Sequence, residues 1–378
     1  MTKRIAVYAF SADPITFGHI NLIERASGLY DELHLVIAVN PTKSALLTIS
    51  EKVETVRASV SHLSNVTVQH STGRYIVYVA RELGAQVIIR GLRNAKDFED
   101  EGTLAEENRH IAPEIETLWM PCLPHLGHVS SSVVKGHIGA DPLWAKRVSE
   151  LVPKPVLLLL EKKQTLQKAR VHWQAYMKAL GVKDVDEEVF SRIVSSYSEQ
   201  HRSYHTLTHI VSMLDGFEEV RHLVANPTEV LGAIWWHDVI YDTEPKFPLI
   251  ASNEERSAAR AEEDCGILGV PTHIVDAIKV KILASAHSSS GEVYDIDTQV
   301  FLDLDLAVLG SKDRYVPYKV GVRFEYSWVE RSLYNQKRLE ILQRFLREER
   351  LYLTEHFHTT YDKQARINLA NEIVELSV

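Results

Sequence analysis

Short apolar or β-branched runs recur through the first part of the chain, and each is separated from the next by enough residues for a helix. The runs cover residues 5–10, 33–39, 66–69, 86–89 and 115–120. This alternation is typical of parallel strands joined by helices, because two parallel strands need a long crossover connection. It therefore predicts an α/β domain with a Rossmann-like parallel sheet.

Beyond residue 164 the strand pattern ends, and apolar residues recur at helical spacing instead, as with Trp173 and Tyr176. A chain of 378 residues also exceeds what one hydrophobic core usually supports. We therefore expect two domains, an α/β domain over residues 1–164 and an all-α domain over residues 165–378.

Composition narrows the functional classes. The chain has 51 acidic and 42 basic residues, for a net charge of −9, which argues against a nucleic-acid or anionic-membrane surface. Cys122 and Cys265 form no CxxC pair, so neither a disulfide framework nor a thiolate zinc site is indicated. No apolar run is long enough for a signal peptide or a membrane span. We expect a cytoplasmic protein that binds neither nucleic acid nor membrane.

A turn with the sequence Thr16-Phe17-Gly18-His19 follows the first predicted strand. At the carboxyl ends of parallel strands, helix N-termini direct backbone N–H groups toward a ligand. Gly18 would let phosphate oxygens approach this turn, and His19 could donate a ring N–H to them. A string this short also occurs as an ordinary helix cap, so its neighbours decide its meaning.

Those neighbours are cationic or hydroxyl-bearing. Lys43 follows the second predicted strand, Arg90 and Arg93 follow the fourth, and Ser130-Ser131-Ser132 opens a late helix. Nucleotidyl transfer needs alignment and neutralisation of phosphate charge, which these groups supply. Each taken singly also fits a surface charge or a helix cap. Together they indicate a site for phosphate-bearing ligands.

In this order and spacing, the residues resemble the phosphopantetheine adenylyltransferase family of the nucleotidyltransferase superfamily, over residues 4–163. The matching stretches are 13–19, 40–43, 90–93, 97–101, 108–110 and 129–135. The resemblance implies that ATP and Mg²⁺ are bound and that the phosphate of 4′-phosphopantetheine attacks the α-phosphorus, giving dephospho-coenzyme A and pyrophosphate. It also implies a homo-oligomer, a hexamer of this domain.

The same resemblance assigns roles to individual residues. The implied catalytic residues are His19, Lys43 and Arg90. Those implied to bind ATP are Ser11, Phe17, Gly18, His19, Gly91, Arg93, Glu101, Ser130, Ser131 and Ser132. Those implied to hold the small phosphorylated acceptor are Ser11, Lys43, Arg90 and Asn108.

Two departures from the family pattern lie on the acceptor side. Phe10 stands where the family has a glycine that admits the acceptor, and residues 71–75 replace a more apolar turn. The ATP-side motifs are nearly intact, so the acceptor is left open. A nucleotide-binding scaffold without catalysis is an alternative, and it predicts ATP binding without transfer.

The second half contains the residue types of a divalent-metal site. Such a metal needs imidazole and carboxylate ligands that converge from separate elements. We expect His205 and His209 to share one face of a helix, because they are four residues apart. Core histidines paired with carboxylates are the structural alternative. Two aspartates in an otherwise apolar helix favour a cation. The candidates are His205, His209, His237, Asp238, Asp303 and Asp305.

This half resembles the HD-domain superfamily of metal-dependent phosphohydrolases, over residues 169–376. The matching stretches are 202–210, 235–242, 253–258 and 301–310. The resemblance implies a divalent metal of open identity and a nucleotide or other phosphoester as substrate. The implied ligands are His209, His237, Asp238 and, in preference to Asp303, Asp305. The residues implied to line the pocket are His205, Asn253, Glu254 and Arg323.

Two functional hypotheses follow for the whole chain. The first is a bifunctional enzyme, an adenylyltransferase joined to a metal-dependent phosphohydrolase. The second is an adenylyltransferase regulated by a helical domain that binds metal and nucleotide without turnover. Loss of phosphoester hydrolysis in variants of His237 and Asp238 would distinguish them.

Overall fold

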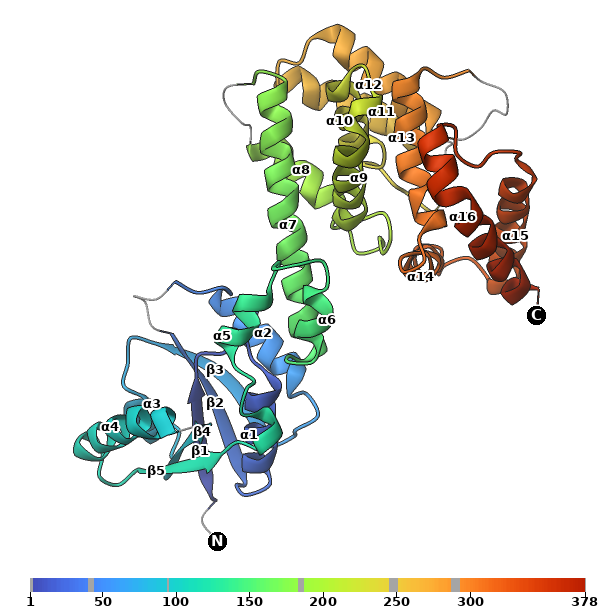
Figure 1. The fold of residues 1–378 in the computed structure, drawn as a ribbon. Helices are drawn as coiled ribbons and strands as arrows, with labels where there is room; N and C mark the ends of the chain where they lie inside the picture. Colours follow the sequence, from blue (N-terminus) through green and yellow to red (C-terminus); the bar gives the residue numbers. More distant parts are fainter. Residues whose placement is uncertain are drawn as a thin grey trace. The chain divides into compact units, whose positions relative to one another are not determined.

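The structure, a computed structural model, describes residues 3–39, 44–93, 95–182, 187–244, 251–286 and 293–377. The chain divides into two compact units, Met1–Gln164 and Thr165–Val378, and the boundary falls within the long helix α7 (Lys154–Ala179) (Figure 1). Among the described helices, none combines the length and apolar character that a membrane span requires.

The N-terminal unit contains five parallel strands in the order β3-β2-β1-β4-β5 (Figure 1). The prediction of an α/β domain with a parallel sheet is therefore confirmed. The strand order reverses between β1 and β4, which marks the crevice where open α/β sheets bind ligands. The strands are β1 (Ile5–Phe10), β2 (Glu32–Val39), β3 (Val66–Thr72), β4 (Val87–Leu92) and β5 (Glu116–Pro121).

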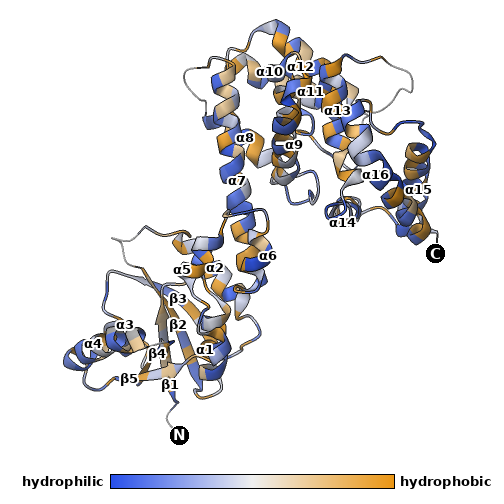
Figure 2. Ribbon diagram, viewed as in Figure 1, coloured by the Kyte–Doolittle hydropathy of each residue, from blue (hydrophilic) through white to orange (hydrophobic). Residues whose placement is uncertain are grey.

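Both faces of this sheet are buried. Successive side chains of a strand point to opposite faces, and along β1 Ala6 and Tyr8 pack into one hydrophobic cluster while Val7 and Ala9 pack into another. Figure 2 shows hydrophobic residues along the strands. The connecting elements are α1 (Phe17–Ser27), α2 (Ile49–Ser59), α3 (Ile76–Glu82), α4 (Ala95–Ile111), η1 (Pro124–Leu126), α5 (Ser131–His137) and α6 (Trp144–Ser149).

Two strands extend further than the sequence predicts. β3 continues to Thr72, which pairs with Val39, and β4 continues through Arg90 and Gly91 to Leu92. Pairing with a neighbouring strand overrides the low strand propensity of residues such as glycine. As a result Arg90 and Gly91 belong to the sheet itself rather than to a loop after it.

The C-terminal unit is helical, as the sequence predicts. After the second part of α7, its helices are α8 (Glu187–Ser196), α9 (Leu207–Val220), η2 (Arg221–Leu223), α10 (Pro227–Trp236), α11 (Asn253–Ile267), α12 (Thr272–Ala284), α13 (Ile296–Leu306), η3 (Ala307–Gly310), α14 (Tyr315–Glu325), α15 (Arg331–Arg347) and α16 (Glu355–Leu376) (Figure 1).

Aromatic side chains fill the centre of this helical unit. Trp173, Trp235 and Trp236 are fully buried, and the rings of Trp173 and Trp235 meet edge to face with centroids 5.3 Å apart. A Cβ atom on Gly232 would lie 2.3 Å from Ile278 Cδ1, so glycine permits the close approach of α10 to α12. This packing fixes the end of α10, where the next residue is His237.

Candidate active sites in the two units

The N-terminal unit has a cavity of about 360 Å³ where β1 and β4 end and α1 begins. It lies at the reversal of strand order, where ligands of such sheets bind. The cavity brings together most of the residues that the sequence assigns to ATP and acceptor. Its lining includes Ser11, Gly18, His19, Arg90, Gly91, Arg93, Glu101, Ser130, Ser131 and Ser132.

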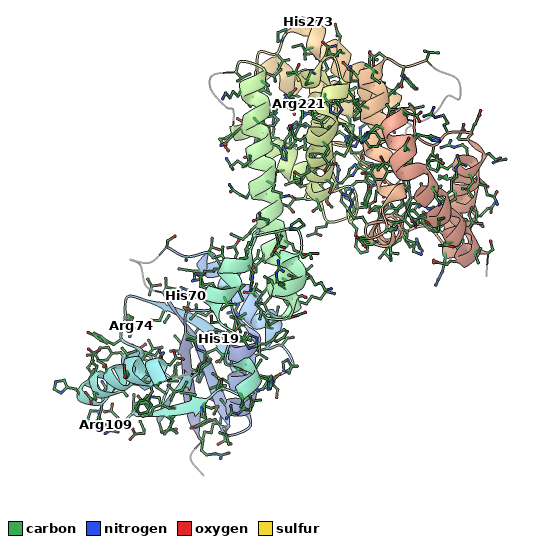
Figure 3. All side chains as sticks on the ribbon, viewed as in Figure 1. His19, His70, Arg74, Arg109, Arg221 and His273 are labelled. Carbon is green, nitrogen blue, oxygen red and sulfur yellow. The ribbon has the colours of Figure 1, made fainter. Side chains whose placement is uncertain are left out.

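The start of α1 fixes the tautomer of His19. The backbone N–H of Thr16 donates to His19 Nδ1 at 3.1 Å, and Thr16 Oγ1 lies 2.9 Å from the same atom. Because Nδ1 accepts this hydrogen bond, the neutral ring carries its proton on Nε2. Burial, together with the nearby charge of Arg93, lowers the pKa of His19 to about 4. At neutral pH His19 (Figure 3) is therefore a neutral donor.

Arg90 and Glu101 form an ion pair that the sequence does not reveal. The guanidinium donates to both carboxylate oxygens, at 2.5 and 2.6 Å, and also to the carbonyl of Ala9 at 2.8 Å. This pair joins α4 to the ends of β1 and β4. The sequence places Arg90 on the acceptor and Glu101 on ATP, but the structure holds the two side chains against each other.

The three serines of the lining differ in their hydroxyl partners. Ser130 is the N-cap of α5, and its Oγ accepts from the backbone N–H of Val133 at 3.2 Å. Ser131 Oγ donates to the carbonyl of Pro14 at 2.8 Å. These bonds fix the start of α5 at the cavity, so two of the serines support its wall.

Phe10 lies at the end of β1 and forms part of the cavity wall. Its ring stacks on Tyr8, with centroids 4.9 Å apart, and lies against His19 at 5.1 Å. Only 8% of the residue is exposed. The phenyl ring therefore supports the catalytic candidate His19 and also occupies the volume that a glycine would leave open.

Two predicted residues do not line this cavity, and a third is not among the described residues. Phe17 is 36% exposed, and its backbone N–H donates to the carbonyl of Leu151. Asn108 is buried, and its side-chain amide lies 3.5 Å from Thr117 Oγ1, between α4 and β5. Neither residue lines the cavity, because helix packing places both elsewhere. Lys43 lies outside the described residues.

The wall of the cavity also contains residues that the motifs do not predict. Tyr8, Leu22 and Cys122 contribute to the wall. Tyr8 could have been found, because it is two residues before Phe10 on the same face of β1. Cys122 follows β5, whose contact with β4 is a tertiary feature that no local motif indicates.

Comparison with known proteins decides the class of this cavity. Residues 8–137 match the cytidylyltransferase-like family. The chain is 40% identical over 161 residues to phosphopantetheine adenylyltransferase of Heliobacterium modesticaldum, spanning 92% of that protein and 42% of this chain. It is also 40% identical over 151 residues to that of Shouchella clausii, spanning 92% of that protein and 40% of this chain. The chain belongs to the phosphopantetheine adenylyltransferase family. Its N-terminal unit is the adenylyltransferase unit.

Beyond the adenylyltransferase unit, the helical unit gathers a second group of polar side chains. Ligand atoms of His209, His237 and Asp238 lie within 4.8 Å of one another. Asp305 joins them from α13, with Oδ1 3.1 Å from His209 Nε2 and 3.7 Å from His237 Nε2. The structure therefore brings the four predicted metal ligands together from α9, from the residues directly after α10 and from α13.

These four residues fit a divalent cation. The Nε2 atoms of His209 and His237 are buried and make no well-aligned hydrogen bond. His237 Nδ1 donates to the carbonyl of Ile234 at 3.1 Å, which leaves Nε2 as the ring atom that faces the cluster. Metal-ligating histidines use their second nitrogen in this way. Two imidazoles and two carboxylates match the donor set of zinc and similar ions.

The electrostatics of the cluster also favour a cation. Burial alone would raise the pKa of Asp238, but His237 and His205 outweigh it and lower this pKa to about 2. The pKa of Asp305 lies well below its usual value, because His209 and His237 overcome the effect of burial. Both carboxylates are therefore ionised at neutral pH inside the fold, where they need a positive charge nearby. Burial alone would lower the pKa of His237, but Asp238 and Asp305 raise it well above its usual value, so the imidazolium supplies that charge and a bound cation would take its place.

One sequence prediction about this site is wrong. His205 was expected on one helix with His209, but α9 begins at Leu207 with Thr206 as its N-cap. His205 lies in the preceding turn because the carboxylate of Glu325 accepts hydrogen bonds from the backbone of that turn. One carboxylate oxygen accepts the backbone N–H groups of residues 203–205 at 2.7–2.9 Å.

His205 nevertheless faces the cluster. Its Nδ1 lies 2.8 Å from the second oxygen of Glu325, and its Nε2 lies 4.0 Å from Asp238 Oδ2. The ring stacks on Tyr241 with centroids 4.0 Å apart. Glu325, which the sequence reasoning did not assign to the site, thus orients His205.

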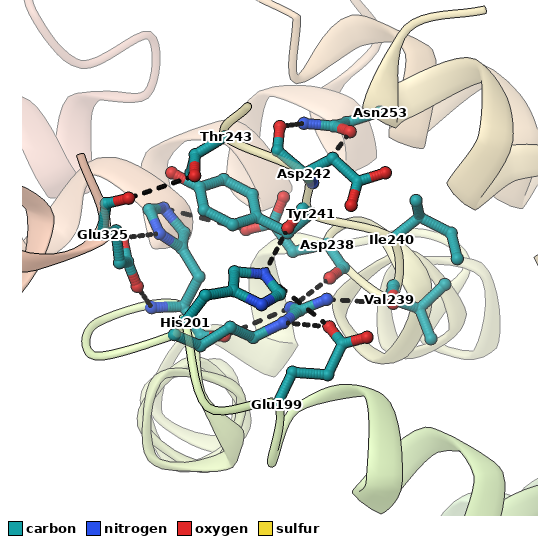
Figure 4. A network of polar contacts seen from close by, with 12 residues as sticks. Glu199, His201, Asp238, Val239, Ile240, Tyr241, Asp242, Thr243, Asn253 and Glu325 are labelled. Carbon is teal, nitrogen blue, oxygen red and sulfur yellow. Dashed lines mark hydrogen bonds and ion pairs between the residues drawn. The ribbon is translucent and has the colours of Figure 1, made fainter. Parts of the chain in front are cut away.

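Arg202 is a second residue that the sequence reasoning left without a role. Its side chain is fully buried and donates to the carbonyls of His205, Asp238 and Val239 (Figure 4). These bonds tie the turn before α9 to the segment after α10. Arg202 therefore holds the two segments that carry His205 and Asp238.

The other predicted residues serve neighbouring structure. Asp303 accepts from the backbone of residues 353 and 354 and from Thr354 Oγ1, so Asp305 reaches His209 and Asp303 does not. The amide of Asn253 bonds the backbone of Asp242 (Figure 4).

Two of the residues predicted to line the pocket remain. Arg323 donates to the carbonyls of Tyr326 and Val329 and lies over the ring of Tyr334, which uses its guanidinium within its own segment. Glu254 lies in the first turn of α11. Neither residue is among the four of the cluster. Arg323 is held by the backbone carbonyls that directly follow α14.

Proposed function

We propose that the adenylyltransferase unit transfers the adenylyl group of ATP to 4′-phosphopantetheine. The observation that carries this proposal is the convergence of Ser11, His19, Arg90 and Arg93 at the reversal point of the sheet. The proteins named phosphopantetheine adenylyltransferase match this chain over 92% of their length, which supports the same acceptor here.

In the proposed reaction, an oxygen of the acceptor phosphate forms a bond to the α-phosphorus of ATP. The bond from that phosphorus to the bridging oxygen breaks, and pyrophosphate leaves with the electron pair. Mg²⁺ bound with ATP would neutralise charge on the phosphates. His19 Nε2–H donates to an α-phosphate oxygen as charge develops there, and Arg90, with Lys43, steadies the acceptor phosphate.

The neutral state of His19 suits this role. Its lowered pKa keeps the ring uncharged, and Thr16 fixes Nε2 as the donor. A donor that is already oriented stabilises the transition state without a cost of reorganisation. Arg90 would have to exchange part of its contact with Glu101 for the acceptor phosphate, which makes Glu101 a residue that sets its position.

The direct test is formation of dephospho-coenzyme A and pyrophosphate from ATP and 4′-phosphopantetheine. A pyridine mononucleotide serves as the comparison acceptor, and Phe10→Gly tests the acceptor side. We expect turnover with 4′-phosphopantetheine, and a lower KM for it in Phe10→Gly, because the substitution opens the cavity wall. ATP binding without transfer to either acceptor would contradict the proposal and support a non-catalytic scaffold.

For the helical unit, we infer a metal-dependent phosphohydrolase of the HD-domain type. The specific observation is the buried cluster of His209, His237, Asp238 and Asp305, in which both imidazole Nε2 atoms lack a well-aligned hydrogen bond. A divalent cation held there would polarise the phosphate and lower the pKa of water. In hydrolysis, a water oxygen bonds to phosphorus, the ester P–O bond breaks, and the leaving alcohol takes up a proton.

The test combines metal analysis with hydrolysis of phosphoesters. We expect the purified protein to contain a divalent metal and to hydrolyse phosphoesters, and we expect His237→Ala and Asp238→Ala to lose both properties. Metal binding without hydrolysis would favour the alternative, a regulatory domain that tunes the first site. The hexamer implied by the family resemblance and the cytoplasmic location expected from the sequence stay predictions.

A further inference from the structure

A second cavity of about 310 Å³ lies beside the metal-ligand cluster, within the helical unit. His209 and Asp305 belong to both the cluster and the cavity lining. A cavity of this size is at the lower end of the range for small-molecule sites, about 300–1,000 Å³. Because two candidate metal ligands line this cavity, a substrate whose phosphate is bound at the cluster could place the rest of its molecule in it.

The cavity follows one face of α9. Its lining includes His209, Met213, Gly216 and Val220, a spacing of three or four residues that places side chains in one row along a helix. With a rise of 1.5 Å per residue, this row is about 16 Å long. The cavity is therefore a groove, with the metal-ligand cluster at one end and Val220 at the other.

A cationic side chain lines the groove near the cluster. Arg314 lines it and forms no ion pair with any residue in the described ranges. Its charge acts on Tyr204, whose ring lies against that of His209 with centroids 4.9 Å apart and a tilt of 41°. A phosphate group at this end would have Arg314 available as a partner, because guanidinium groups bind phosphate well.

The rest of the groove is mostly apolar. Met213, Leu304, Val308 and Phe357 line it, together with hydroxyl side chains such as that of Ser212. The described lining includes neither asparagine nor glutamine, the amide side chains suited to the polar edges of a nucleobase. Glu219 at the far end would repel a second anionic group. These features fit a long, uncharged arm better than a nucleoside.

We propose that this groove binds the extended, uncharged arm of a phosphomonoester whose phosphate lies at the cluster. The inference rests on the proposed phosphohydrolase function and names its substrate class. It predicts that chain length beyond the phosphate, rather than a base, determines specificity.

The test uses the full-length protein with its metal and three phosphomonoesters: 4′-phosphopantetheine as the long-arm probe, glycerol 3-phosphate as the short one, and deoxyadenosine monophosphate as the nucleotide. We expect kcat/KM for the long-arm probe to exceed that for each of the others at least about tenfold, in line with the discrimination that apolar pockets achieve. ATP is left out, so the adenylyltransferase unit does not consume the probe.

Gly216→Leu tests the groove itself, because it adds a side chain midway along α9. Its Cβ would lie 3.3 Å from Leu304 Cδ2, a flexible side-chain end that can move. We expect kcat/KM for the long-arm probe to fall at least about tenfold and that for glycerol 3-phosphate to stay within about twofold. Glu218→Leu, an exposed position on α9 outside the lining, is the matched control and should leave both unchanged.

A binding measurement separates this inference from the proposed hydrolase. In the wild-type protein, the long-arm probe should slow amide hydrogen exchange over residues 212–220, and inorganic phosphate should not. If nothing is hydrolysed but this protection appears, the hydrolase is wrong and the groove stands. Absence of the protection, a preference for the nucleotide, or an equal loss on all substrates in Gly216→Leu would overturn the groove.

Discussion

The two units assemble their sites by different physical routes. In the adenylyltransferase unit, neighbouring parallel strands end together, so the pairing of β1 with β4 places Phe10 and Ser11 near Arg90. In the helical unit, His209 lies on α9, His237 directly follows α10 and Asp305 lies on α13, and the three meet only because these helices pack. The first site is a property of topology and the second a property of packing. Each should therefore fail independently of the other.

Removing a ligand of the helical cluster should have the largest effect. We expect His237→Ala to lose bound metal and to reduce phosphoester hydrolysis to background. This loss exceeds the roughly 10–100-fold fall in metal affinity or activity that follows when a residue hydrogen-bonded to a metal ligand is replaced. Metal analysis and a phosphate-release assay measure it. His273→Ala, an exposed histidine on α12 (Figure 3), is the control. Full metal content in His237→Ala would break the assignment.

The matching change in the other unit is His19→Ala. We expect kcat for adenylyl transfer to fall about 10²–10³-fold, the usual result of removing one oriented donor to a transition state. Pyrophosphate release measures it, with the exposed His110→Ala as control. Hydrolysis by the helical unit should be unchanged. A fall in both activities would mean that the two sites are coupled.

Glu325→Gln tests whether packing holds the second site. The buried carboxylate accepts three backbone N–H groups and contacts His205. An amide replaces one acceptor oxygen by a donor, so we expect the free energy of unfolding of the helical unit to fall by about 2–3 kcal/mol. Urea denaturation measures it, and Glu348→Gln, at an exposed position, should change nothing. Equal stability of both variants would contradict a packing-held site.

The smallest effect concerns pH and the first site. His19 has a pKa of about 4 when folded and an ordinary value near 6.5 when unfolded. Its contribution to stability is therefore present above pH 6.5 and is lost as pH falls toward 4. At pH 5 this histidine should cost about 2 kcal/mol relative to pH 8. Urea unfolding of wild type and His19→Gln at both pH values measures the contribution of His19 to the free energy of unfolding. Equal pH dependence would show that the ring is not buried as neutral.

The same contrast explains what the sequence could predict. Apolar runs identify the five strands, and parallel topology then brings the ends of β1 and β4 together. Most of the ATP-side residues could therefore be assigned from motifs alone. That Phe17 and Asn108 do not line the cavity could not be predicted, because a motif does not show which way a helical residue points. Cys122 was missed because its contact with the cavity depends on the pairing of β5 with β4.

The helical site was less accessible to sequence reasoning. The residue types of the cluster were found, but His205 was assigned to a helix that begins two residues later. The helix does not extend to His205 because Glu325, 120 residues away, accepts the backbone N–H of this residue. Arg323 was placed in the pocket, whereas its guanidinium caps carbonyls of its own segment. Partners so distant in sequence leave no periodic signal.

The central claim is that the chain carries two separate active sites. The most direct measurement is the rate of pyrophosphate release from ATP and 4′-phosphopantetheine by His237→Ala, in parallel with wild type. The account predicts that this rate stays within about twofold of wild type although the metal and the hydrolysis are lost. A rate that falls together with the metal content would contradict it and make the helical unit a regulator of the first site.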